Sequence, residues 1–113
     1  MTPERFDSAC RALPAATMDV QWGKDHVYKV GGRMFAVLGP DGTASFKASD
    51  IAFEMLTQSG AARPAPYLAR AKRVYFDDLA SLDDDEAAQY LTAAHALTAA
   101  KLTRKARTEL GLG

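Results

Sequence analysis

Apolar and polar side chains alternate between residues 26 and 47, in the run HVYKVGGRMFAVLGPDGTASFK. Alternation with a period of two is typical of half-buried β-strands. The pair Gly31-Gly32 and the segment 39–42 (GPDG) interrupt this run with residues that suit tight turns. The pattern therefore predicts three antiparallel strands joined by two short hairpins.

The two turns also predict a register for the three strands. With turns at Gly31-Gly32 and at residues 39–42, the expected cross-strand pairs are Val30 with Arg33, Tyr28 with Phe35, Val37 with Ala44, and Phe35 with Phe46. The core face then consists of Tyr28, Val30, Phe35, Val37, Ala44 and Phe46. The opposite face is mixed, because it carries Val27, Lys29, Met34, Ala36, Leu38, Thr43, Ser45 and Lys47. A slip of one residue would exchange the two faces.

Helical patterns flank this meander on both sides. Thr2 and Pro3 are typical of a helix start, and Pro14 ends the first helix. Ser49 and Gly60 bound a second, short helix. A long C-terminal helix is expected after Ser81 as its cap, and its buried stripe comprises Ala87, Leu91, Ala94 and Leu97 or Thr98.

Two further strands complete the predicted sheet. Residues 18–22 alternate, with Met18, Val20 and Trp22 on one side, and residues 73–77 alternate again. Prolines at positions 64 and 66 leave segment 61–68 extended, so that it crosses back to the sheet. Because the first strands are linked by hairpins, we expect a mainly antiparallel sheet. The predicted fold is an α+β two-layer sandwich with the N- and C-terminal helices packed on one face.

Composition narrows the class of protein. The 113 residues fit a single domain spanning 1–113, and a formal net charge of zero disfavours a strongly basic nucleic-acid binder while leaving local patches open. Cys10, the single cysteine, lies on the apolar stripe of the first helix and is expected to be a buried structural thiol. No apolar run approaches the roughly 20 residues of a membrane span. We therefore expect a cytoplasmic protein without membrane contact.

Catalytic and metal-binding motifs are not evident in the sequence. The two histidines and the cysteine do not lie at ligand spacing, and His95 is expected to be a packing or helix-surface residue. A helix start explains the acidic run at residues 83–86. The sequence contains neither a phosphate-binding glycine loop nor a dinucleotide fingerprint. We expect no catalytic residue, no metal and no cofactor.

Basic residues gather around the proline-containing segment and on the mixed face of the meander. Such side chains can contact phosphates, and interleaved aromatic rings can stack on bases. The candidate nucleic-acid contacts are Lys29, Lys47, Arg63, Tyr67, Arg70, Lys72 and Arg73. An ordinary solvated surface is the alternative interpretation, and the basic tail from Lys101 to Arg107 allows the same two interpretations.

Over nearly its whole length the chain resembles the MmcQ/YjbR family of small bacterial proteins. The resemblance rests on the N-terminal TPERFDSAC, on Trp22-Gly23, on residues 27–36 (VYKVGGRMFA), on Phe46-Lys47, on residues 65–68 (APYL) and on Lys101-Leu102. It implies a CyaY-like α+β fold, an antiparallel sheet flanked by helices, and a DNA-binding role without a catalytic motif. Many members carry a tryptophan near position 73, where this chain has none.

Two functional hypotheses follow. The first is a non-enzymatic module that binds DNA weakly and non-specifically through its phosphates, with Tyr67 stacking on bases. The second is a protein or small-ligand interaction module without a nucleic-acid role, which docks through the apolar patch at Met34, Ala36 and Leu38. In one version of the second hypothesis the protein is a homodimer; otherwise a monomer is expected.

Overall fold

The sheet forms the centre of the molecule. The structure, a computed structural model, describes residues 1–65 and 72–113. Within these ranges the strands are β1 (Ala16–Gln21), β2 (Asp25–Val30), β3 (Arg33–Leu38), β4 (Ala44–Lys47), β5 (Arg63–Pro64) and β6 (Arg73–Phe76). All neighbouring strands are antiparallel, in the order β1-β2-β3-β4-β6-β5.

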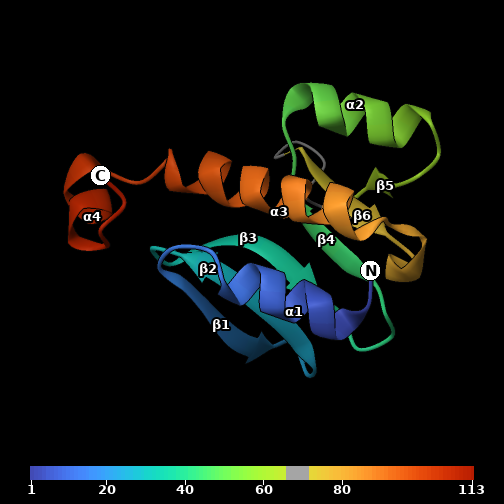
Figure 1. The fold of residues 1–113 in the computed structure, drawn as a ribbon, viewed down its shortest axis with the longest axis horizontal. Coiled ribbons are helices and arrows are strands. Elements are labelled where there is room, and N and C mark those ends of the chain that lie inside the picture. Colours follow the sequence, from blue (N-terminus) through green and yellow to red (C-terminus); the bar gives the residue numbers. More distant parts are fainter. Residues whose placement is uncertain (66–71) are drawn as a thin grey trace.

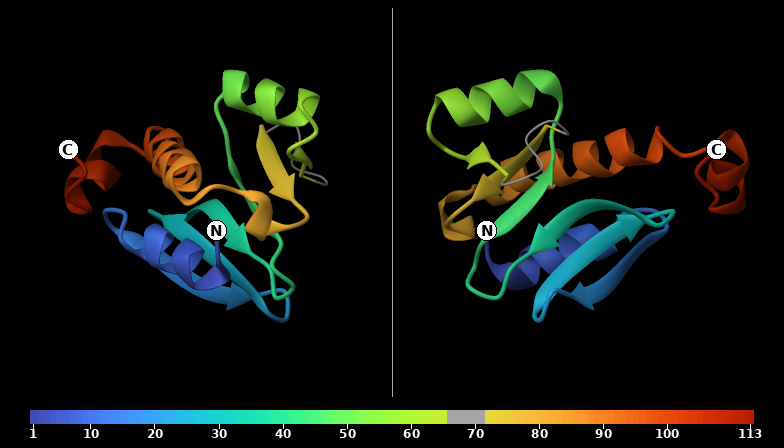
Figure 2. Two further views of the ribbon diagram at one scale, coloured as in Figure 1. Left: turned by 45° about the vertical axis from the view of Figure 1, so that its right-hand side comes forward. Right: turned by 180° about the vertical axis from the view of Figure 1, so that it is seen from behind.

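The described helices are α1 (Pro3–Arg11), α2 (Asp50–Gln58), α3 (Asp84–Ala99) and α4 (Arg104–Glu109). Helices α1 and α3 cover one face of the sheet, and α2 packs near β5 and β6. Figure 1 shows α1 and α3 in front of the strands, and the rear view in Figure 2 brings the strands in front of these two helices. The predicted two-layer α+β sandwich is confirmed. Among the described helices, none combines the length and apolar character needed to cross a membrane.

A β-bulge separates the observed register from the expected one. Val30 pairs with Arg33 as predicted, and Lys29 pairs with Met34, but Tyr28 then pairs with Ala36. Phe35 is therefore an extra residue in β3, and the predicted pair Tyr28–Phe35 is wrong.

The loop of the second hairpin also differs from the expected one. The backbone N–H of Gly39 donates to the carbonyl of Thr43 at 2.9 Å, so the loop is one residue longer than expected. The observed pairs are Leu38 with Ala44 and Ala36 with Phe46, so the predicted pairs Val37–Ala44 and Phe35–Phe46 are wrong. Glycine suits position 39 in this loop, since a Cβ atom there would lie 2.2 Å from the Thr43 hydroxyl.

These shifts change which side chains enter the core. Ala36 and Leu38, expected on the mixed face, are 0% and 6% exposed in the core cluster. Val37, expected in the core, is half-buried and pairs with Ser45 on the opposite face. Phe35 stays buried because the bulge allows two consecutive side chains to face the helices.

Aromatic contacts join the sheet to the helices. The rings of Tyr28 and Phe6 meet edge to face at 5.9 Å, and Phe46 stacks on Tyr90 of α3 at 5.8 Å. His95, 7% exposed, meets Phe35 edge to face, and its Nε2–H donates to the Pro14 carbonyl at 2.7 Å. Of the two roles expected for His95, packing or helix surface, the structure shows packing.

Several helix and strand boundaries differ from the prediction. Asp83, not Ser81, caps α3, because its carboxylate accepts the backbone N–H groups of Asp85 and Glu86 while the Ser81 hydroxyl donates to the Asp78 carbonyl. Strand β1 ends before Trp22, which lies in the β1–β2 turn with φ of 50°.

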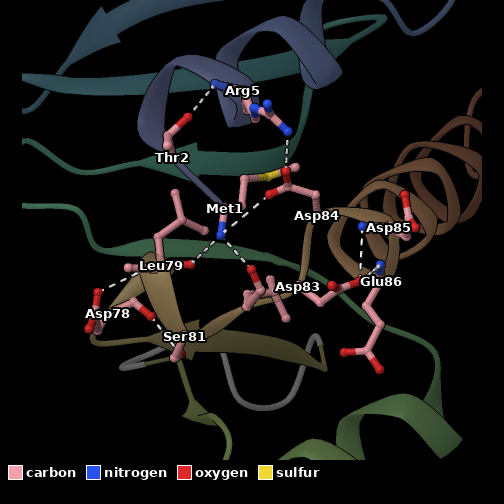
Figure 3. A network of polar contacts seen from close by, with 12 residues as sticks. Met1, Thr2, Arg5, Asp78, Leu79, Ser81, Asp83, Asp84, Asp85 and Glu86 are labelled. Carbon is pink, nitrogen blue, oxygen red and sulfur yellow. Dashed lines mark hydrogen bonds and ion pairs between the residues drawn. The ribbon is translucent and has the colours of Figure 1, made fainter.

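The N-terminal residue links α1 to the start of α3. The α-amino group of Met1 donates to the carbonyls of Leu79 and Leu82 and lies 3.6 Å from an Asp84 carboxylate oxygen (Figure 3). Arg5 of α1 pairs with the same carboxylate. One acidic residue of α3 thus joins two positive groups from the N-terminal segment.

The C-terminal end of α3 is held by a hairpin glycine. Gly31 has φ of 58°, which favours glycine, and a Cβ atom at this position would lie 2.7 Å from the Leu102 side chain. Leu102 packs against the core cluster directly after α3. The β2–β3 turn and the segment between α3 and α4 are therefore in close contact.

A partly buried hydrogen bond connects Tyr28 of β2 with Asp7 of α1. The Tyr28 hydroxyl donates to the Asp7 carboxylate at 2.6 Å, and the Arg11 guanidinium donates to the same carboxylate at 2.9 Å. Burial raises the pKa of Tyr28, and the hydrogen bond to Asp7 and the Asp7 charge raise it further. Burial acts to raise the pKa of Asp7, but the bonds from Tyr28 and Arg11 outweigh it and lower this pKa overall.

Replacing Tyr28 with Phe tests this bond through the pH dependence of stability. The lowered pKa of Asp7 means that its contribution is present above about pH 4 and is lost as the pH falls. The raised pKa of Tyr28 means that its contribution is present below about pH 10 and is lost as the pH rises. We expect Tyr28→Phe to lower the free energy of unfolding by about 1 kcal/mol near neutral pH.

Urea denaturation from acid to alkaline pH measures the difference in the free energy of unfolding between the parent and Tyr28→Phe. This difference should become smaller at both ends of the pH range. Tyr90→Phe is the matched control, since the Tyr90 hydroxyl makes no hydrogen bond within the described part of the chain. A constant difference between parent and Tyr28→Phe at all pH values would contradict the prediction.

Candidate nucleic-acid interface

The sheet face turned away from α1 and α3 carries the candidate site, and we call it the open face. One row across this face follows the strand register and contains Asp19, Val27, Val37, Ser45, Tyr75 and Arg63. The adjoining row contains Lys29, Met34, Lys47 and Arg73. The open face thus combines apolar, aromatic and basic side chains.

Lys47 and Arg73 lie at one end of the open face, and two further basic residues, Lys72 and Lys101, are close enough to act on the charge of Lys47. Lys47 pairs with Arg73 across β4 and β6, and the carbonyl of the adjacent Lys72 accepts the Ala48 N–H at 2.9 Å. Lys101 approaches from the end of α3. We call Lys47, Lys72, Arg73 and Lys101 the basic corner.

Electrostatics support this grouping. Burial lowers the pKa of the Lys47 ammonium, and the positive charges of Lys101, Arg73 and Lys72 lower it further. Asp50 acts in the opposite direction. Lys47 therefore lies within reach of three other cations and one carboxylate.

Arg73 also has a structural role. Its guanidinium donates to the backbone carbonyl of Met34, the residue immediately before the bulge. Burial lowers the pKa of Arg73. A guanidinium carries five N–H donors, so this single bond supports the bulge without using the whole group.

Two further described candidates, Arg63 and Lys29, each lie beside an acid. Arg63 forms an ion pair with Asp77 at 2.8 Å, and its guanidinium lies 4.8 Å from the centre of the Tyr75 ring. Lys29 lies 3.6 Å from the Asp19 carboxylate. Both residues belong to the open face, but a neighbouring acid balances each charge.

The structure brings together only part of the predicted set. Lys47, Lys72 and Arg73 meet in the basic corner, while Lys29 and Arg63 lie elsewhere on the open face. Tyr67 and Arg70 lie outside the described residues. Lys101 was expected only in a basic tail, because nothing in the local sequence indicates that the end of α3 reaches β4.

A pocket of about 270 Å³ opens on the same face. Its lining includes Trp22, Asp25, Met34, Val37, Ser45 and Tyr75. Trp22 is 68% exposed at the rim. We call this the sheet pocket. It replaces the predicted docking patch at Met34, Ala36 and Leu38, of which only Met34 faces this side.

Metal ligands are not clustered in the described structure. Over residues 1–65 and 72–113, no three His, Cys, Asp or Glu side chains are arranged to hold a metal ion. Cys10 lies on the buried side of α1, and burial raises the pKa of its thiol. This position agrees with the structural role expected for it.

The chain is similar to a known protein family and to a solved structure. The sequence model of the YjbR family matches residues 11–97. Protein DR2400 of Deinococcus radiodurans, a DUF419 domain, has a similar crystal structure, with a TM-score of 0.86 and 24% identity over 99% of this chain and 89% of that one. At this identity the likeness concerns the fold alone. None of the curated proteins matches the chain.

Replacing Arg73 with Met tests its contact with the bulge. Methionine retains much of the side-chain length but cannot donate to the Met34 carbonyl, so we expect a loss of about 1–2 kcal/mol in the free energy of unfolding. Urea denaturation at neutral pH measures it. Arg33→Met, at an exposed hairpin position, is the matched control. Equal stability of the two variants would show that the contact does not support the fold.

Proposed function

The chain belongs to the YjbR family, and we propose that it is a non-catalytic module that binds DNA through the basic corner. The pairing of Lys47 with Arg73 across β4 and β6 carries this proposal. Like charges directly opposite one another destabilise an antiparallel pair. Lys72 and Lys101 add to the same positive field. An anionic partner would relieve this repulsion.

Phosphates of a nucleic-acid backbone are suitable partners for such a group. Lysine ammonium groups act as compact point charges, and a guanidinium can donate two parallel hydrogen bonds to a phosphate. Contacts of this kind bind without reading the base sequence. The proposed activity is therefore weak, non-specific binding that depends strongly on salt.

Neutralising two lysines tests the DNA proposal. We expect Lys72→Gln/Lys101→Gln to reduce the slope of log K against log salt by roughly 1.8, since each phosphate contact contributes about 0.9. Fluorescence anisotropy of a labelled duplex at roughly 50 and 200 mM salt measures the slope. Arg73 is left intact because its loss would also affect the bulge.

Lys24→Gln/Lys105→Gln is the matched control. It removes the same total charge from two exposed lysines outside the basic corner. If both double variants reduce the slope equally, net charge rather than the corner controls binding. Absence of binding by the parent protein at either salt concentration would exclude the DNA proposal.

Docking of another protein, or of a second copy, on the open face is the second candidate function. The exposure of Trp22 (68%) at the sheet pocket favours it. Light scattering at high protein concentration tests the self-association version. If the protein self-associates, the measured mass is that of a dimer. A strictly monomeric mass would exclude self-association.

A further inference from the structure

We infer that the open face binds single-stranded nucleic acid, with one base in the sheet pocket and a neighbouring phosphate at Lys47 and Arg73. This inference rests on the proposed function, because the basic corner supplies the phosphate contacts. It adds a site for the base, which a duplex would keep stacked and paired. An aromatic surface beside a basic groove is the usual arrangement for binding single strands.

The lining of the sheet pocket suits a flat aromatic ring. Trp22 and Tyr75 contribute aromatic groups, and Met34 and Val37 contribute apolar surface. Trp22 is exposed although its backbone has φ of 50°, a conformation that side chains with a Cβ atom disfavour. The turn therefore holds an indole at the pocket rim without burying it in the core.

The pocket and the basic corner are adjacent in the strand register. Lys47 lies two residues from Ser45 in β4, and Arg73 lies two residues from Tyr75 in β6. Two residues of an antiparallel strand span about 7 Å, a distance comparable to the separation between a base and its own phosphate. Arg73 also bonds to Met34, which lines the pocket, so the two parts of the site share a contact.

The open face is acidic at one end and basic at the other, and this arrangement suits the base and the phosphate of a nucleotide. Asp25 lines the pocket near Trp22, at the opposite end of the strands from Lys47 and Arg73. A carboxylate can accept a hydrogen bond from the exocyclic amine of cytosine, a group that thymine lacks. The expected ligand therefore has an amine-bearing base toward Asp25 and its phosphate toward the basic corner.

Trp22, the single tryptophan of the chain, reports directly on the pocket. We expect a short oligo(dC) strand to quench its fluorescence at roughly 50 mM salt, and oligo(dT) to bind more weakly. By anisotropy of a labelled oligo(dC), Trp22→Gly should weaken binding about tenfold, because a stacking surface is lost. Its affinity for a duplex should not change.

Glycine is chosen to replace Trp22 so that an effect on binding can be distinguished from an effect on stability. Glycine accepts the left-handed backbone at this turn, so the unfolding midpoint of Trp22→Gly should not fall below that of the parent. Val20→Ala is the matched control, since it removes apolar surface that is 57% exposed in β1 but lies on the other face of the sheet, opposite His26. Tyr75→Leu, on the other side of the pocket, should weaken oligo(dC) binding as Trp22→Gly does.

The outcomes distinguish this inference from the DNA proposal. If the parent protein binds a duplex but Trp22→Gly leaves the affinity for oligo(dC) unchanged, the inference is overturned and the DNA proposal stands. If neither strand nor duplex binds the parent, both fail. Cytidine monophosphate that binds as tightly as oligo(dC) would identify a free nucleotide as the ligand and overturn the assignment to a strand. A dimeric mass that Trp22→Gly makes monomeric would assign the face to a second copy.

Discussion

The bulge in β3 determines how the two faces of the sheet are used. With Phe35 as an extra residue, Ala36 and Leu38 enter the core while Val37 and Met34 line the open face. The backbone carbonyl of Met34 then receives a guanidinium from β6. A single inserted residue thus places Val37, rather than Ala36 and Leu38, on the open face beside Met34, whose carbonyl accepts the hydrogen bond from Arg73.

The helical layer depends on a small number of polar contacts at its ends. His95 ties α3 to the loop after α1, and Asp84 ties its first turn to Met1 and Arg5. Between these points, aromatic rings and small side chains make the contact with the sheet. Because α3 is held at its start and along its length, its C-terminal lysine reaches the end of β4 in a defined position.

The elements and their order follow from the sequence because each signal is local. Periodicity, capping residues and hairpin glycines depend on neighbouring positions, and they gave the antiparallel sheet and the flanking helices correctly. The register required knowledge of a bulge, which depends on packing of Phe35 against His95 far along the chain. An alternation rule with a strict period of two could not show it.

The candidate site was predictable only where its residues are sequence neighbours. Lys72 and Arg73 are adjacent, and Lys47 was found through alternation in the meander. Lys101 joins them only through the path of α3, and Trp22 lines the pocket because a turn, rather than a strand, places it there. The acids that balance Lys29 and Arg63 are likewise visible only in three dimensions.

The contact between Gly31 and Leu102 has an evolutionary consequence. Leu102 directly follows Lys101, and it fits against the hairpin because Gly31 has no Cβ atom. A larger residue in the turn would displace Leu102 and move the neighbouring ammonium away from β4. Among relatives that retain the basic corner, positions 31 and 102 should therefore covary, although they are distant in sequence and neither would touch a ligand.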